Sequence, residues 1–206
     1  MPLSLKPGLT LYFCRHGETE ANILRRFQGQ SRDTALTETG REQARMVASV
    51  LKRKTPGHET LAYVSSPLGR ACATTKIILE TLGLPRERYA TDARLMEMNL
   101  GHWEGLTHAE ARARDPRAYD ARAADKWTIR IPGGESYADV AERVQSWFGS
   151  LTVDTFAVSH GGFLRILRGL FAGLTWQQMS DLDEPQGVLF RVSGSAVERL
   201  GAQENE

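Results

Sequence analysis

Three segments of the chain end in residue types that could hold a phosphate. They close with Arg15-His16-Gly17, Arg70 and His160-Gly161-Gly162, and each follows a short apolar run. Guanidinium, imidazole and the backbone N–H groups beside glycine are donors that can approach an oxyanion closely. One such segment alone would be weak support, but three together predict a binding site for a phosphoryl group.

Other phosphate chemistries lack the residues they need. A cysteine-nucleophile phosphatase requires an arginine six positions after its cysteine, but Glu20 and Ile78 stand at those positions after Cys14 and Cys72. The chain has no G-x-x-x-x-G-K-[ST] and no G-x-G-x-x-G motif. Its five histidines form no H-x-x-x-H or H-x-H pair, so no metal site is expected. Histidine therefore remains as the candidate nucleophile.

The elements that must position these residues alternate between strand and helix. Short apolar runs predict strands at Leu9–Cys14, Leu61–Ser65, Thr155–Ser159, Val188–Val192 and Ala196–Leu200. The first three lead into helical patterns, as in βαβ units, and in such parallel sheets ligands gather beyond the carboxyl ends of the strands. The sequence therefore predicts an α/β fold, a three-layer α/β/α sandwich with a mostly parallel central sheet, in a single domain spanning residues 1–206.

Helical periodicity and start signals predict the helices. Apolar residues recur at helical spacing from Thr37 to Arg53, where Thr39 and Glu42 offer a capping box. Further helices are expected between Pro67 and Gly83, from Thr107 to before Pro116, from Ser136 onward, and over Phe163–Phe171. The Ala/Arg-rich stretch 109–124 is interpreted as a solvated helix rather than a nucleic-acid arm, because acidic residues interrupt it.

Composition limits the classes of partner and location. The 206 residues include 26 Lys and Arg against 25 Asp and Glu, so the formal charge is +1 and no nucleic-acid partner is expected. No stretch nears the roughly 20 apolar residues of a membrane span, so no membrane partner is expected either. Cys14 and Cys72 supply no disulfide framework, and the N-terminus lacks the apolar run of a signal peptide. A cytoplasmic protein is therefore predicted.

Five ordered motifs resemble the histidine phosphatase superfamily, in its phosphoglycerate mutase-like branch. They are Cys14–Asn22 with Arg26, Gln28-Gly29 and Leu36–Ala44; Val64–Ala71 with Thr74-Thr75; Leu95–Gly101 with Trp103-Glu104-Gly105; Gly133–Ser136; and Val158–Gly162. The resemblance extends from about residue 10 to about residue 170. Five motifs in the same order make a chance match very improbable.

The resemblance implies a role for each matched residue. His16 would attack phosphorus and become phosphohistidine, while Glu97 would protonate the leaving oxygen and then deprotonate water. Arg15, Arg70 and His160 would hold the phosphoryl oxygens. The matched substrate-binding residues are Asn22, Gln28, Gly29 and Gly161.

Attack on phosphorus requires a particular protonation state of His16. Two other carboxylates remain candidates for the general acid. For His16 to attack, one ring nitrogen must be unprotonated while the other N–H is held, for which a backbone carbonyl is suited. Nearby cations favour that neutral form of the ring. Glu18, beside the nucleophile, and Glu104 are the alternatives to Glu97.

The expected function is a phosphomonoesterase, a phosphoric monoester hydrolase of the histidine acid phosphatase type that acts on small phosphorylated metabolites without a cofactor. Cofactor-dependent phosphoglycerate mutase is the alternative, although the chain lacks the Tyr-Gly-x-Leu-x-Gly-like stretch of true mutases beyond Glu97. A non-catalytic phosphate- or phosphopeptide-binding protein is a second alternative. The presence of the full reactive set argues against it.

The motifs leave the natural substrate open. Between Gly29 and Thr37 the chain is one residue longer than the usual family pattern, and Ala35 stands where a proline is common. We expect the loops around residues 25–36 and 102–130 to form the distal part of the pocket and to set substrate preference. Related proteins are often dimers, so the resemblance allows a homodimer.

Overall fold

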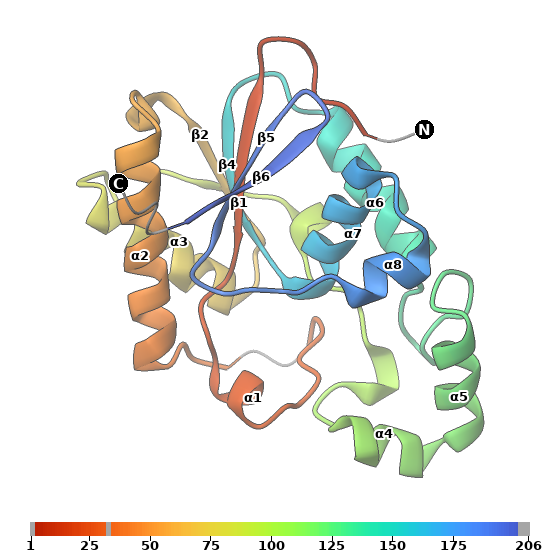
Figure 1. Cartoon of the computed structure of the whole chain (residues 1–206). Helices are drawn as coiled ribbons and strands as arrows, with labels where there is room; N and C mark the ends of the chain where they lie inside the picture. The colour runs from red at the N-terminus through yellow and green to blue at the C-terminus, as the bar shows by residue number, and fades with distance from the viewer. Residues whose placement is uncertain (1–2, 32–33, 202–206) are drawn as a thin grey trace.

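A six-stranded sheet forms the middle layer of the computed structural model, which describes residues 3–31 and 34–201 (Figure 1). The strands are β1 (Thr10–Arg15), β2 (Ala62–Ser65), β3 (Ala90–Thr91), β4 (Thr155–Ser159), β5 (Leu189–Ser193) and β6 (Ala196–Leu200). Their order is β3-β2-β4-β1-β5-β6, in which β3, β2, β4 and β1 pair in parallel and β5 and β6 are added antiparallel. The mostly parallel sheet predicted from the sequence is confirmed.

Helices cover both faces of the sheet, which gives the predicted three layers (Figure 1). One face carries α2 (Glu38–Lys54) and α3 (Gly69–Thr81). The other carries α6 (Tyr137–Gly149) and α7 (Gly161–Ala172), with the short α8 (Trp176–Asp181) packed on α7. Each face has its own buried cluster, because the side chains of β1 and β4 alternate between the two sides of the sheet.

A small lobe lies beyond the carboxyl end of β1, at the bottom of Figure 1. It contains α1 (Glu20–Ile23), α4 (His108–Arg114) and α5 (Pro116–Ala124). The described residues also form three single 3₁₀ turns, at His58–Thr60, Ala93–Leu95 and Gly101–Trp103. The buried side chains of Trp103, Ala111 and Ile131 form a separate apolar cluster that holds this lobe together.

The parallel register brings two predicted site segments side by side. Residue pairs along β1 and β4 run from Leu11 opposite Thr155 to Arg15 opposite Ser159. The two strands therefore end at the same level, and His16 and His160 follow at adjacent strand ends. The backbone N–H of His16 donates to the Ser159 carbonyl at 2.9 Å, which extends the ladder by one residue.

One detail of the predicted helices is wrong. Helix α2 is capped by Thr37, whose hydroxyl accepts from the Gly40 N–H at 3.0 Å, and not by a Thr39–Glu42 box. The reason is tertiary: the Thr37 N–H donates to the Glu18 carbonyl at 2.9 Å and holds Thr37 in extended backbone.

The stretch 109–124 is helical and mostly exposed, as predicted from the sequence. It forms two helices, because Asp115 ends α4 before Pro116 and caps α5 by accepting from the Ala118 N–H. Its inward face buries Ala111 and Arg122. Within the described ranges, no helix is long and apolar enough to cross a bilayer.

The loop after β1 packs against the start of α2 through two glycines. A Cβ on Gly17 would lie 2.2 Å from the carbonyl oxygen of Gly40, and a Cβ on Gly40 would lie 2.1 Å from that of Glu18. The Gly17 N–H also donates to Thr74 Oγ1 at 3.0 Å. Backbone meets backbone here, and the contact fixes the segment that carries His16.

Gly40→Ala should therefore destabilise the fold, because the added methyl group displaces the backbone of Glu18. We expect a loss of about 1–3 kcal/mol in the free energy of unfolding, the usual cost of overpacking. The matched control is Gly149→Ala at the end of α6, where an added Cβ meets nothing within 4 Å and alanine should stabilise by up to about 1 kcal/mol. Urea denaturation compares the two, and equal stability of the variants would contradict the argument.

Candidate active site

His16 is held in one tautomer at the carboxyl end of β1. Its ring is 1% exposed, and Nδ1 lies 2.7 Å from the Gly17 carbonyl oxygen. A carbonyl oxygen can only accept, so Nδ1 carries the proton. Nε2 then has a lone pair, which accepts from Arg70 Nε at 3.3 Å. The backbone carbonyl expected from the sequence argument is thus present.

The surroundings keep His16 neutral. Burial lowers the pKa of His16 well below 6.5, and the Arg15 and Arg70 guanidinium groups lower it further, while the bond to the Gly17 carbonyl opposes them. The ring therefore stays neutral at physiological pH, with its Nε2 lone pair available for attack on phosphorus.

Arg70 connects His16 to the loop on the opposite side of the cavity. It lies in the first turn of α3, is 2% exposed and donates from Nη2 to the Gly29 carbonyl at 2.9 Å. Thr74, one turn further on, donates to the Arg70 carbonyl at 2.8 Å. A long, otherwise flexible side chain is in this way fixed beside Nε2 of His16.

Arg15 and His160 present polar atoms that have no partner among the described residues. Arg15 donates from Nη1 to the Glu184 carbonyl at 2.8 Å, but its Nε is buried and unpaired. The rings of His16 and His160 lie 5.1 Å apart, and Nδ1 of His160 is also buried and unpaired. Unpaired buried donors are costly in a folded protein, and a phosphoryl oxygen would satisfy them.

The tautomer of His160 follows from its second contact. Nε2 of His160 lies 2.7 Å from Ser66 Oγ, and that oxygen already accepts from the Leu68 N–H at 3.3 Å. Among the described residues, Nε2 is the only acceptor bonded to the Ser66 hydroxyl, so the hydroxyl donates to Nε2, which leaves the proton of the neutral ring on Nδ1. Burial lowers the pKa of His160 well below 6.5, with Arg70 as the next cause. His160 is thus a neutral donor.

The carboxylate of Glu97, a residue from a distant part of the sequence, lies against the N-terminus of α7. It accepts from the N–H groups of Met98 at 2.7 Å, Gly162 at 3.2 Å and Phe163 at 3.3 Å. A Cβ on Gly162 would lie 2.6 Å from Glu97 Oε1, so glycine is what allows this close approach. The carboxylate is therefore fixed by backbone groups, which suits a group that must exchange a proton at a defined place.

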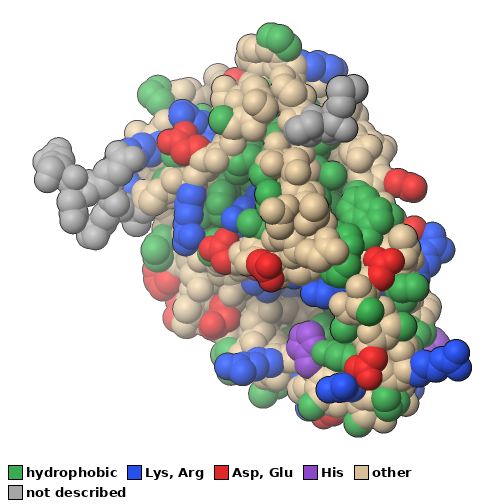
Figure 2. Space-filling view, turned by 45° about the vertical axis from the view of Figure 1, so that its right-hand side comes forward, with side chains coloured by type: hydrophobic (Ala, Val, Ile, Leu, Met, Phe, Trp, Pro, Cys, Tyr) green, Lys and Arg blue, Asp and Glu red, His purple; other side chains and the backbone are tan. Residues whose placement is uncertain are grey.

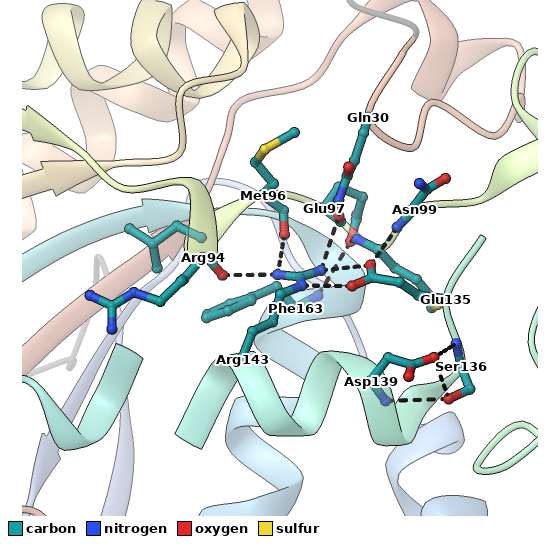
Figure 3. Close-up of polar contacts among 12 residues, drawn as sticks. Gln30, Arg94, Met96, Glu97, Asn99, Glu135, Ser136, Asp139, Arg143 and Phe163 are labelled. Atoms are coloured by element: carbon teal, nitrogen blue, oxygen red, sulfur yellow. Dashed lines mark hydrogen bonds and ion pairs between the residues drawn. The ribbon is translucent and has the colours of Figure 1, made fainter. Parts of the chain in front are cut away.

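Arg143 on α6 holds the segment that carries Glu97 (Figure 3). It donates to the carbonyl groups of Arg94 and Met96 at 2.8 Å and of Glu97 at 3.1 Å. Arg143 also pairs with Glu135 at 2.8 Å. Five donor positions in a planar fork allow one guanidinium to bind several carbonyl groups at once.

Two further residues hold the same segment from outside. Glu135 accepts from the Asn99 N–H at 2.7 Å, and Gln30 donates to the Glu97 carbonyl at 2.8 Å (Figure 3). Glu135 belongs to the Gly133–Ser136 motif, but the sequence predicted no role for it. Arg143 was not anticipated, and only its position one turn beyond Asp139 on α6 could have signalled it.

Seven of the nine predicted site residues line a single cavity of about 490 Å³. They are Arg15, His16, Asn22, Gln28, Gly29, Arg70 and Glu97. His160 and Gly161 are not among the described residues that line this cavity. His160 lies beside His16, and Gly161 borders a smaller recess next to Arg15.

Two of the predicted substrate-binding residues are themselves held by neighbouring side chains. Asn22 accepts at Oδ1 from Thr19 N–H at 3.1 Å and from Gln186 Nε2 at 3.1 Å, which leaves its Nδ2 amide as the remaining donor. Gln186 also donates to the His16 carbonyl at 3.1 Å. Gln28 accepts from Thr34 Oγ1 at 3.2 Å. Gln186 is a residue that the sequence analysis missed.

The alternative acids are engaged elsewhere. Glu18 accepts from Thr37 Oγ1 at 2.8 Å, and neither it nor Glu104 lines the cavity. Glu104 instead accepts from the N–H groups of Gln30 and Ser31 at 2.8 Å and fixes the Gly29 loop. The geometry therefore favours Glu97 over both.

The distal wall comes from the two loops expected from the sequence. Phe27 and Arg26 contribute from one loop, and Trp103, Tyr119 and Arg122 from the other. Arg32 and Asp33 of the longer first loop lie outside the described residues. Figure 2 shows basic side chains gathered where the small lobe meets the rest of the molecule.

Comparison with known proteins places the chain in a family. Residues 11–195 match the histidine phosphatase superfamily (branch 1). The chain is 38% identical over 177 residues to the glucosyl-3-phosphoglycerate phosphatase of Mycolicibacterium vanbaalenii, which covers 80% of this chain and 74% of that protein. It is 35% identical over 187 residues to a 2,3-bisphosphoglycerate-dependent phosphoglycerate mutase of Methylobacterium radiotolerans, which covers 86% of each.

A solved structure agrees with this placement. A mycobacterial glucosyl-3-phosphoglycerate phosphatase in complex with VO3 matches with a TM-score of 0.75 and 32% identity, over 93% of this chain and 96% of that one. The chain belongs to the histidine phosphatase superfamily, so the predicted family is confirmed. A mutase occurs among the relatives, but the predicted phosphatase function fits them better.

The two buried histidines should make stability fall as the pH decreases. In the folded state both pKa values lie well below 6.5, whereas in the unfolded chain they return to about 6.5. Below that pH the unfolded state therefore binds protons that the folded state does not. Each of the two histidines then lowers the free energy of unfolding by up to about 1.36 kcal/mol for each pH unit of acidification. Urea unfolding of the wild type at pH 7.5, 6.5 and 5.5 measures it.

The variant His16→Gln/His160→Gln should lose this added slope, which is about 2.7 kcal/mol per pH unit at most for two protons. The exposed His102→Gln serves as the control and should retain it. Identical slopes in the wild type and in the double variant would contradict the neutral, buried state of the two rings.

Proposed function

We propose that the chain is a phosphomonoesterase, of the histidine acid phosphatase type, that hydrolyses small phosphorylated metabolites through a phosphohistidine at Nε2 of His16. The observation that carries this proposal is the neutral, buried His16, with Nδ1 held by a carbonyl and Nε2 beside Arg70. The cytoplasmic location and the homodimer expected from the sequence stay predictions.

The first step transfers the phosphoryl group to the protein. Nε2 of His16 attacks phosphorus, and the bond from phosphorus to the ester oxygen breaks with its electron pair leaving on that oxygen. Glu97 donates its proton to the same oxygen, so the product leaves as a neutral alcohol. The Nδ1 proton of His16 stays bonded to the Gly17 carbonyl and stabilises the charge that develops on the ring.

The second step returns the site to its initial state. The Glu97 carboxylate accepts a proton from water, and the water oxygen attacks phosphorus opposite the His16 nitrogen. The bond between phosphorus and Nε2 breaks, inorganic phosphate leaves, and Glu97 is protonated again. The same carboxyl group thus acts as acid and then as base at one position.

Charge stabilisation comes from the fixed donors around phosphorus. Arg15, Arg70 and His160 contribute N–H groups from three separate strand ends, two of them with buried atoms that have no partner in the described part of the chain. Removing a single preorganised donor of this kind typically costs about 2.7–4 kcal/mol of transition-state stabilisation. Arginine suits this role because its planar fork matches two phosphoryl oxygens.

His16→Ala should abolish turnover, because the variant lacks the ring nitrogen that attacks phosphorus in the proposed mechanism. We expect the rate of p-nitrophenyl phosphate hydrolysis to fall by roughly 10³-fold or more. Rapid quenching of the wild type with ³²P-labelled substrate should trap label that is stable to base and labile to acid, and His16→Ala should trap none.

The exposed His102→Ala is the matched control and should trap label like the wild type. With 3-phosphoglycerate as the ester, the phosphatase proposal requires free phosphate, and formation of 2-phosphoglycerate would favour the mutase. Label trapped by His16→Ala at the wild-type level would exclude the proposed nucleophile.

Glu97→Gln should slow the hydrolysis of esters with poor leaving groups far more than that of esters with good ones. A departing alkoxide needs a proton, whereas a nitrophenolate does not. We expect kcat/KM to fall by roughly 10²–10⁴-fold for alkyl phosphates, the usual worth of general acid catalysis, and clearly less for p-nitrophenyl phosphate. Glu18→Gln is the control for a nearby carboxylate. Equal losses on both substrate types would remove Glu97 as the acid.

A further inference from the structure

The Gly29 loop (residues 29–31) contacts both halves of the candidate active site. On one side the Gly29 carbonyl accepts from Arg70 Nη2 at 2.9 Å, and Arg70 Nε lies 3.3 Å from Nε2 of His16. On the other side, Gln30 donates from its side-chain amide to the Glu97 carbonyl at 2.8 Å (Figure 3). Adjacent residues of one loop therefore connect the guanidinium beside His16 with the segment that carries Glu97.

Glu104 fixes that loop and connects it to the same segment. Its carboxylate accepts from the N–H groups of Gln30 and Ser31 at 2.8 Å and of Leu100 at 3.1 Å. Gly29 has a φ of +56°, and a Cβ there would lie 1.9 Å from Glu104 Oε1, so this close approach needs glycine. One carboxylate thus holds the loop and the segment together.

The segment that carries Glu97 has no regular structure of its own. Residues 96–100 belong to no strand or helix, so no ladder of backbone hydrogen bonds holds them. Their position depends on side chains from elsewhere: Arg143 and Gln30 donate to the Glu97 carbonyl, and Glu104 accepts from the Leu100 N–H. Arg143 anchors the segment to α6, whereas Gln30 and Glu104 anchor it to the loop that Arg70 contacts.

The proposed chemistry needs a fixed separation between the two halves. Arg70 holds the phosphoryl group while Glu97 protonates the oxygen that leaves the same phosphorus atom. A displacement of about 1 Å between such groups can cost roughly 10²-fold in rate. Gly29, Arg70 and Glu97 all line the cavity, whereas Gln30 and Glu104 do not. The latter two therefore act on the reacting groups through the backbone that they hold.

We propose that Gln30 and Glu104 are positioning residues that hold the acid Glu97 at a fixed distance from the phosphoryl-binding Arg70. The inference rests on the proposed function, since it gives two further residues a part in the same reaction. Their parts differ. Gln30 bonds to the Glu97 backbone alone, whereas Glu104 holds the loop that contacts both Arg70 and the Glu97 segment.

Gln30→Met removes the side-chain donor and keeps the length of the side chain. Because Gln30 acts through Glu97, kcat for alkyl phosphates should fall by at least about fivefold, the worth of one neutral hydrogen bond, and clearly less for p-nitrophenyl phosphate. In a Glu97→Gln background the same substitution should cost less than about twofold on alkyl phosphates, because the acid that it positions is gone. Gln145→Met, at an exposed position of α6, is the matched control.

Glu104→Met removes all acceptors of that side chain and so releases the loop. Because the loop also contacts Arg70, kcat/KM should fall by at least about tenfold on both types of ester, the worth of a hydrogen bond to a charged group. The Kd of orthovanadate, a mimic of the phosphoryl group during transfer, should rise by at least about tenfold in Glu104→Met and stay within about twofold in Gln30→Met. The exposed Glu142→Met is the matched control, and urea denaturation establishes that each variant is folded.

A merely structural role would give a different pattern. Equal losses of Gln30→Met on both types of ester, or a full additional loss in the Glu97→Gln background, would overturn the inference for Gln30. A folded Glu104→Met protein that binds orthovanadate like the wild type would overturn it for Glu104.

Hydrogen exchange tests the inference without turnover. The N–H groups of Gly162 and Phe163 lie in the first turn of α7, where no helical carbonyl accepts from them, and they donate to the Glu97 carboxylate. Their exchange should quicken by at least about fivefold in Gln30→Met and not in Gln145→Met. If the wild type hydrolyses no ester, the proposed function fails and this measurement decides, since unchanged exchange in Gln30→Met would contradict the positioning of Glu97.

Discussion

The chemistry of this protein depends on one short hydrogen bond, from Nδ1 of His16 to the carbonyl of the next residue, Gly17. That bond fixes which ring nitrogen carries the proton and so determines that Nε2 faces Arg70 with a lone pair. Burial and two guanidinium groups then keep the ring neutral. A protonated ring could not attack phosphorus, so in the proposed mechanism the cations that bind the phosphoryl group also prepare His16 for attack.

The surrounding fold serves to hold this arrangement without flexible connections. The Gly17 backbone is packed against Gly40 and bonded to Thr74, while Arg70 reaches across to the Gly29 carbonyl. On the other side, Arg143 binds the carbonyl groups of Arg94, Met96 and Glu97, in the segment that carries Glu97 (Figure 3). The proposed nucleophile and the proposed acid are thus positioned from opposite faces of one sheet, by α3 and by α6.

Much of this could be predicted from the sequence because short apolar runs and parallel-sheet geometry place strand ends at a common edge. The ends of β1 and β4 bring His16 and His160 together for that reason. Local capping signals were reliable where nothing competed, as at Thr107 and Ser136. At α2 a tertiary bond from Thr37 to Glu18 decided the start, and a sequence pattern cannot show such a bond.

The parts that the sequence did not reveal depend on long-range packing. Gln186 reaches His16 because β5 runs antiparallel beside β1, so the residues before β5 begin at the rim where β1 ends. Knowing the direction of the last strand would have pointed to them. Arg122 was hidden because an alternation of alanine and charge in 109–124 resembles a solvated helix, while the fold turns one of its arginines inward.

The protonation state of His16 is the most direct test of the account. Two-dimensional ¹H–¹⁵N correlation spectra of ¹⁵N-histidine-labelled protein, with His16→Gln used for assignment, distinguish protonated from unprotonated ring nitrogens. At pH 6 the account predicts a proton on Nδ1 of His16 and none on Nε2. A ring protonated on both nitrogens, or one with its single proton on Nε2, would contradict it.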